Sequence, residues 1–233
     1  LPAGSRVLVI GAPGETGRGV AYGTALPFHL LNVRAGRMST IHDDPGHFVR
    51  WLAAAGWGGG DPREIAETYA PRTLYGSYLL DTLQREIAAA RGRVRFDVVE
   101  GRVVEAAFAD GAYRLRTEDG SAMAATSLGL CQGHGAPAFP IPADLVDPAA
   151  RARMIADPWS DRRLATIARD ARVLIVGTGL TMVDQVLSLA ARGHVGPISA
   201  VSRRGLVPTA HLDRRAEPVA LDAADRPRSL RAL

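Results

Sequence analysis

The sequence contains no lysine, so each of its 28 positively charged side chains is an arginine. A P-loop requires a lysine that reaches the phosphates, and a Schiff base requires a lysine amine, so both kinds of site are excluded. The arginines are scattered along the chain and do not alternate with aromatic residues, and we therefore expect no nucleic-acid partner. A solvated, arginine-rich surface accounts for the net charge of +4.

Cysteine and long apolar runs are also scarce. Cys131 is the only cysteine, and a single cysteine can form neither an internal disulfide nor a zinc cluster. No apolar run approaches the roughly 18 residues that a membrane helix needs. No basic-then-apolar leader is visible either, so we expect a cytoplasmic protein without a membrane partner.

What the chain does contain is typical of a globular α/β protein. Its 233 residues are 47% hydrophobic and 22% charged, which is enough for one large domain or two smaller ones. Residues 6–10 have the pattern of a buried strand. A helix is expected within residues 43–56, with Asp44 as its N-cap and Gly56 at its end, and a second helix within residues 75–92.

The pattern changes after the second helix. Residues 94–131 alternate between apolar and polar side chains, and the pairs Asp110-Gly111 and Asp119-Gly120 are typical of hairpin turns. These features predict an antiparallel β-meander. A proline-rich linker follows, and residues 172–205 then predict a β-α-β unit.

The β-α-β unit contains the strongest candidate for a binding site. Its first strand enters the helix through Gly177-Thr178-Gly179, where bare backbone N–H groups and the helix N-terminus favour a diphosphate. Met182 stands where a nucleotide-binding fingerprint has its third glycine, and an ordinary strand-to-helix turn without a ligand is the alternative. We assign the turn and the first helical residues, Leu180 and Thr181, to a dinucleotide.

The end of the second strand indicates which dinucleotide is bound. NAD sites usually have a carboxylate there for the ribose 2′-hydroxyl, whereas this chain has Ser202, Arg203 and Arg204, which begin 25 residues after Gly177. Arginine binds phosphate through a bidentate fork, so these residues favour the 2′-phosphate of NADP. The alternative is a pair of solvated surface arginines.

Long stretches of the chain resemble a known family. "GRGVAYGTALPFHLLNVRAGRMSTIHDDPGHFVRWL", "RTLYGSYL" and "VLIVGTGLTMVDQVLSLAARGHVGPISAVSRRGLVPTAH" are similar to bacterial FAD/NAD(P)-binding proteins of the NAD-binding-9 type, distant relatives of flavin-containing monooxygenases. The resemblance implies an α/β fold with two Rossmann-like nucleotide-binding domains of the flavoprotein disulfide-reductase kind. The FAD domain would span residues 1–145, including the meander, and the NAD(P) domain residues 146–233.

The resemblance also implies that both domains are incomplete. Residues 6–10 correspond to the second strand of the FAD domain, so we expect a fragment that lacks the first FAD fingerprint and the C-terminal part. The stretch that contains Cys131 resembles the strand that closes the domain, and we expect Cys131 to be buried. The resemblance places the flavin nucleotide near the following residues: Gly17, Gly19, Asn32, Met38 and Gly133.

Other chemistry-bearing residues have simpler explanations. The segment from His42 to His47 offers metal-ligand types, but its Asp44-Pro45 pair is also typical of a helix start, and we expect no metal. Ser77 lacks the sequence context of a nucleophile. His134 follows Gly133 and is either a cofactor contact or a plain linker histidine, and we assign no role to His211.

The function that these features favour is an FAD-dependent, NADPH-linked oxidoreductase, with monooxygenase as one possible activity and a small molecule as substrate. In such enzymes the cofactors supply the reactive chemistry, and the protein orients them. The alternative is a nucleotide-binding module without catalysis, or an inactive remnant of a split flavoprotein whose missing segments are on another chain.

Overall fold

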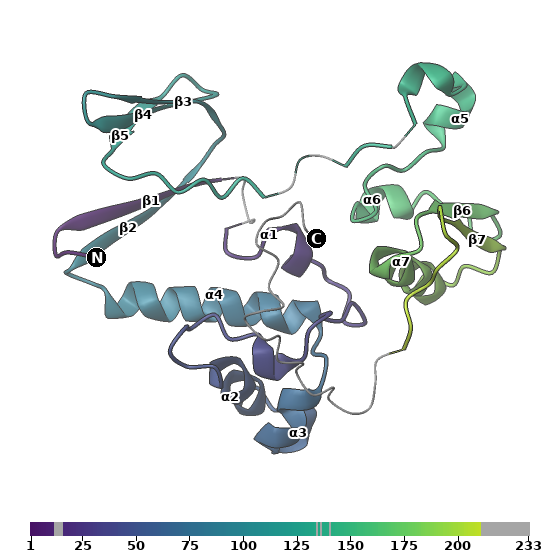
Figure 1. The fold of residues 1–233 in the computed structure, drawn as a ribbon, viewed down its shortest axis with the longest axis horizontal. Helices are drawn as coiled ribbons and strands as arrows, with labels where there is room; N and C mark the ends of the chain where they lie inside the picture. The colour runs from purple at the N-terminus through teal and green to yellow at the C-terminus, as the bar shows by residue number, and fades with distance from the viewer. Residues whose placement is uncertain (12–15, 134, 136, 140, 211–233) are drawn as a thin grey trace, which may run out of the picture.

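The first sheet of the computed structural model is a pair of parallel strands joined by a long helical connection (Figure 1). The structure describes residues 1–11, 16–133, 135, 137–139 and 141–210. Strand β1 (Ser5–Gly11), predicted from its apolar run, pairs in parallel with β2 (Val94–Glu100). The prediction that β2 begins an antiparallel meander was wrong, because alternation along a strand does not determine its pairing partner.

The connection between β1 and β2 is mostly helical. The long helix α4 was predicted, whereas the short helix α3 was not. Asp61 caps α3 by accepting a hydrogen bond from the Arg63 amide at 2.9 Å, and Pro62 occupies its first turn. The elements are α1 (Gly19–Tyr22), η1 (Ala35–Arg37), α2 (His47–Ala54), η2 (Gly58–Gly60), α3 (Pro62–Glu67) and α4 (Arg72–Ala89).

Of the two predicted ends of α2, only the C-terminal end is confirmed. Gly56, with φ of 75°, lies just past the helix, as predicted. The N-cap is Gly46 rather than Asp44, and no side chain caps this end. The Asp44 carboxylate instead forms an ion pair with Arg50 one turn into the helix, which removes it from the capping position.

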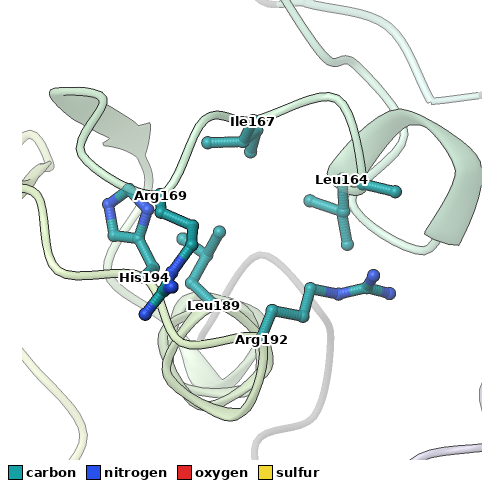
Figure 2. A pocket seen from close by; sticks show the side chains of 7 residues that line it. Leu164, Ile167, Arg169, Leu189, Arg192 and His194 are labelled. Carbon is teal, nitrogen blue, oxygen red and sulfur yellow. The ribbon is translucent and has the colours of Figure 1, made fainter.

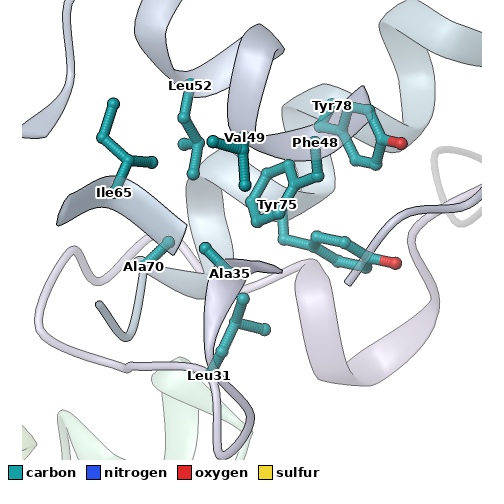
Figure 3. Close-up of a cluster of buried hydrophobic side chains, with 9 residues drawn as sticks. All are labelled: Leu31, Ala35, Phe48, Val49, Leu52, Ile65, Ala70, Tyr75 and Tyr78. Atoms are coloured by element: carbon teal, nitrogen blue, oxygen red, sulfur yellow. The ribbon is translucent and has the colours of Figure 1, made fainter. Parts of the chain in front are cut away.

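The main apolar core lies among α2, α3 and α4 (Figure 3). The Phe48 ring lies 5.0 Å from the Tyr75 ring and 4.7 Å from the Tyr78 ring, measured between centroids. Burial, with smaller contributions from Tyr22 and Tyr78, raises the pKa of Tyr75 to about 12. The buried members are Leu31, Ala35, Phe48, Val49, Leu52, Ile65, Ala70, Tyr75 and Tyr78.

A three-stranded antiparallel sheet follows β2. Asp110 and Gly111 both have positive φ, 52° and 77°, which suits the tight turn between its first two strands. The expected closing strand around Cys131 is absent from the described residues, and Cys131 is exposed rather than buried. The strands are β3 (Val103–Ala109), β4 (Ala112–Thr117) and β5 (Ala122–Ala125), in that order.

The C-terminal part contains the predicted β-α-β unit. Strands β6 (Val173–Val176) and β7 (Ile198–Val201) are parallel and are connected by α7 (Leu180–Ala191). Three short helices precede this unit: η3 (Ala143–Leu145), α5 (Pro148–Ala152) and α6 (Asp161–Leu164). In the part of the chain that the structure describes, no helix has both the length and the apolar character needed to cross a membrane.

Candidate functional site: the corner between β6 and α7

The turn from β6 into α7 is open at both of its glycines. Gly177 has φ of 109°, a conformation that strongly favours glycine, whereas Gly179 has an extended backbone that other residues adopt. A Cβ built on either glycine meets no described atom within 4 Å. The bare backbone at Gly179 therefore provides access to the corner rather than a special conformation.

The N-terminus of α7 offers donors at this corner. The first amides of any helix, here those of Leu180 and Thr181, have no partner within the helix. No side chain among the described residues accepts a hydrogen bond at the N-cap of α7, which is Gly179. The amides and the helix dipole together favour an anion such as a diphosphate.

The end of β7 is joined directly to the corner. The Gly177 amide donates to the Val201 carbonyl at 2.8 Å, and the Thr178 and Ser202 hydroxyl oxygens lie 2.9 Å apart. Ser202 Oγ also accepts from the Gly205 amide at 3.0 Å. The Thr178 hydroxyl donates its one proton to the Leu206 carbonyl, so the Ser202 hydroxyl donates to Thr178 Oγ. The group that Thr178 can offer a ligand is therefore its backbone N–H.

Arg203 and Arg204 follow Ser202 and are exposed. Among the described residues, neither arginine forms an ion pair with a carboxylate. The structure thus brings the strand tip of β7 beside the glycine turn, with two guanidinium groups next in the chain. This arrangement fits a phosphorylated dinucleotide at the corner.

The five residues assigned to flavin do not share one environment. Gly17 and Gly133 have positive φ, 84° and 63°, and both are exposed, as is Asn32. Met38 packs against the main core, which gives it a structural role. Gly19 begins α1 and lines a cavity that the sequence did not predict.

This cavity has a volume of about 420 Å³ and lies between the α1 segment and α7. Gln185 of α7 lines it and is 6% exposed, yet neither amide atom of its side chain has a hydrogen-bond partner among the described residues. The sequence offered one sign of this cavity, which is the polar Gln185 side chain within a mostly apolar helix. The lining residues are Arg18, Gly19, Val20, Gly23, Thr24, Ala25, Leu26, His29, Asp157, Pro158, Trp159, Leu164, Gln185 and Ser188.

A buried polar network borders the cavity. Ser188 Oγ donates to the Asp184 carbonyl at 2.7 Å, so it accepts from His29 Nε2, which lies 2.9 Å away. His29 Nδ1 then accepts from the Thr24 hydroxyl at 3.0 Å. The Asp184 carboxylate lies 3.4 Å from the Arg72 guanidinium. Burial raises the pKa of Asp184, while Arg72 and His29 oppose that shift.

A second cavity, of about 340 Å³, lies at the opposite end of α7 (Figure 2). Figure 2 shows Leu164, Ile167 and Leu189 around the same space as three basic side chains. One of these, Arg169, donates to the Gly193 carbonyl at 2.9 Å, just past the helix. A helix C-terminus favours cations, which accounts for Arg169 and Arg192, and we assign the diphosphate to the N-terminal corner.

Comparison with known proteins identifies one family. A model of the family described as FAD-NAD(P)-binding matches residues 2–135, which is more than half of the chain and extends from β1 beyond β5. The match ends before the corner at Gly177, so the corner is supported by its geometry alone. No curated protein matches the chain. The chain belongs to the FAD-NAD(P)-binding family, whose cofactors are FAD and NAD(P).

Proposed function

We propose that the chain is part of an FAD-dependent, NADPH-linked oxidoreductase. The observation that carries the proposal is the open corner of Gly177 and Gly179 beside the exposed Arg203 and Arg204. The α7 amides would hold the diphosphate, and the two guanidinium groups would bind the 2′-phosphate. The Ser202 hydroxyl would turn from Thr178 to donate to the same phosphate or its ribose.

We assign the flavin to the N-terminal part of the chain, because the family match covers residues 2–135. Gly133 is exposed, and a Cβ placed on it meets no described atom within 4 Å, so its backbone can approach a nucleotide. When bound, FAD would accept a hydride from NADPH and pass electrons to oxygen or another acceptor. A monooxygenase is the specific form of this activity that the resemblance favours.

One observation favours a nucleotide-binding module without catalysis. Strand β1 ends at Gly11, where a carboxylate for the FAD ribose is expected, and Gly11 has no such group. A weakly held flavin would make the chain a binding module. The absorbance spectrum of the purified protein with added FAD separates the two functions, since bound flavin that NADPH bleaches supports the enzyme.

The nucleotide assignment is tested with arginine variants. NADP⁺ and NAD⁺ binding is measured by calorimetry for Arg203→Ala, Arg204→Ala and the double variant. We expect NADP⁺ affinity to fall at least about tenfold in the double variant and NAD⁺ affinity to change less than about twofold. Arg91→Ala, an exposed arginine beyond the end of α4, is the matched control. An unchanged preference for NADP⁺ would contradict the assignment.

A further inference from the structure

We propose that the cavity between the α1 segment and α7 binds the amide edge of a planar ring, and that this ring belongs to the small-molecule substrate. The identification of the ligand as a substrate rests on the proposed function, whereas the amide-binding site does not. The cavity of about 420 Å³ is within the range of small-molecule sites. Among the described residues, none from the nucleotide corner lines it.

The first argument is the state of Gln185. Its side chain is more than nine-tenths buried, lines the cavity, and lacks partners for both the amide nitrogen and the amide oxygen among the described residues. Buried polar groups are normally paired, because an unpaired group has lost water without regaining a hydrogen bond. A ligand that offers an acceptor and a donor side by side satisfies both atoms.

An amide is the group that matches this pair. Its carbonyl accepts from the Gln185 NH₂ group, and its N–H donates to the Gln185 carbonyl, which gives two parallel hydrogen bonds. A carboxylate would leave the Gln185 carbonyl without a donor, and an amine would leave the NH₂ group without an acceptor. The chemistry of Gln185 therefore selects an amide over either charged group.

The second argument is Arg18. Its Nε atom is buried and has no partner among the described residues, and the residue lines the same cavity. Arg18 thus supplies a second donor for an acceptor oxygen elsewhere on the ligand. The preferred ligand is a ring that carries an amide and a second acceptor, such as a lactam, an imide or an aromatic carboxamide with a further oxygen.

The third argument is the wall of the cavity. Trp159 lines it together with Leu26 and Leu164. The indole is fixed from two sides, because the His29 ring meets it edge-on at 5.7 Å and the Arg72 guanidinium lies 5.5 Å from its centroid. A rigid aromatic wall beside aliphatic side chains favours a flat, apolar ring.

Benzamide, an uncharged planar amide, is the probe, and toluene is the ring without the amide. Nuclear magnetic resonance of the ¹⁵N-labelled full chain follows the Gln185 side-chain amide and the Trp159 indole N–H. We expect benzamide to shift both signals in a saturable manner, with Kd in the millimolar range expected of a fragment. Gln185→Leu should weaken benzamide about tenfold and change toluene binding less than twofold.

Gln84→Leu, on the exposed side of α4, is the matched control. Thermal unfolding provides the second measurement: Gln185→Leu should unfold at the same or a higher temperature, because it removes an unpaired buried amide. A lower unfolding temperature together with unchanged benzamide affinity would show a structural role for Gln185 and overturn the proposal. So would the absence of shifts at Gln185 up to about 50 mM benzamide.

Competition distinguishes a substrate site from a cofactor site, since the rings of FAD and NADP⁺ also carry amide edges. We expect benzamide to bind equally well with saturating FAD and NADP⁺, and displacement by either would overturn the assignment to substrate. If neither nucleotide binds while benzamide does, the proposed function fails and the amide site stands. If the nucleotides bind and benzamide does not, the amide site fails alone.

Discussion

The imidazole Nε2 of His29 lies 2.9 Å from the hydroxyl of Ser188, although the two residues are 159 positions apart in the chain. Both are almost fully buried, with exposures of 2% and 1%. The bond joins the segment after α1 to α7, whose N-terminus forms the corner to which we assign the dinucleotide. A polar contact that is enclosed in this way stabilises one arrangement of the two segments.

We expect His29→Ala to lower the free energy of unfolding by about 2 kcal/mol, because the half-buried Thr24 hydroxyl and the buried Ser188 hydroxyl lose their partner. Urea denaturation measures the effect. His42→Ala is the matched control, because the His42 side chain is fully exposed, and it should change stability by less than about 0.5 kcal/mol. Equal effects of the two substitutions would mean that the contact contributes nothing.

Asp184 predicts a pH dependence of stability. Burial raises the pKa of its carboxyl above the ordinary 3.8, so the folded state keeps the proton at pH values where the unfolded state has released it. Stability therefore falls as pH rises from about 4 through the raised pKa. Asp184→Asn has no such titration, so its stability relative to the parent chain should increase with pH over that window.

The measurement is the free energy of unfolding of both proteins between about pH 4 and pH 7. Asp119→Asn is a useful control, because the hydrogen bond from Thr117, with others from Ser121, lowers the pKa of that exposed carboxyl. Because that pKa lies below the window, the Asp119→Asn difference should stay nearly constant between about pH 4 and pH 7. If the Asp184→Asn difference shrank with rising pH, attraction to Arg72 would outweigh the burial of Asp184.

The elements that the sequence predicted well have a local cause. The β6–α7–β7 unit follows from an apolar run, a glycine turn and a helical repeat that all lie within about 30 residues. The end of α2 follows from Gly56, which suits a positive φ. The dinucleotide assignment at Gly177 and Gly179 comes from this same local motif.

The elements that were predicted wrongly depend on distant partners. The parallel pairing of β2 with β1 is set across the whole α1–α4 connection, and alternation within β2 does not report it. Cys131 is exposed because no described strand forms around it, although Leu128 and Leu130 before it are apolar. The cavity at Gln185 arises only when α7 meets residues 18–29, so a linear pattern shows the polar residue but not its surroundings.

Substitution of Gly179 tests whether this glycine is needed for approach of the dinucleotide or for the backbone conformation of the turn. Because its backbone is extended and no described atom lies within 4 Å of a Cβ there, Gly179→Ala should change stability by less than about 0.5 kcal/mol. The added methyl group would stand where the diphosphate approaches, so we expect NADP⁺ affinity to fall at least about tenfold.

Gly177 provides the comparison. Its φ of 109° is strained for alanine, so Gly177→Ala should lower both stability and NADP⁺ affinity. Calorimetry and urea denaturation on the two variants test the distinction. Unchanged NADP⁺ affinity in Gly179→Ala would mean that the diphosphate lies elsewhere.

Gly76 of α4 is required for close approach between helices rather than for a special backbone. A Cβ placed there lies 2.4 Å from the Tyr22 carbonyl oxygen and 3.1 Å from Arg18 Cδ. The carbonyl belongs to the last residue of α1, so a methyl group forces α1 away from α4. We expect Gly76→Ala to lower the free energy of unfolding by about 1–3 kcal/mol, the usual cost of overpacking.

The same displacement should reach the cavity, because Arg18 packs over Gly76 and also lines the benzamide site. Gly76→Ala should therefore weaken benzamide while leaving NADP⁺ affinity within about twofold, since the nucleotide corner is built from other residues. Gly129→Ala is the control, because a Cβ there meets no described atom within 4 Å and its φ is not positive. If Gly76→Ala matched Gly129→Ala in stability, α1 would not be held against α4 as closely as the geometry requires.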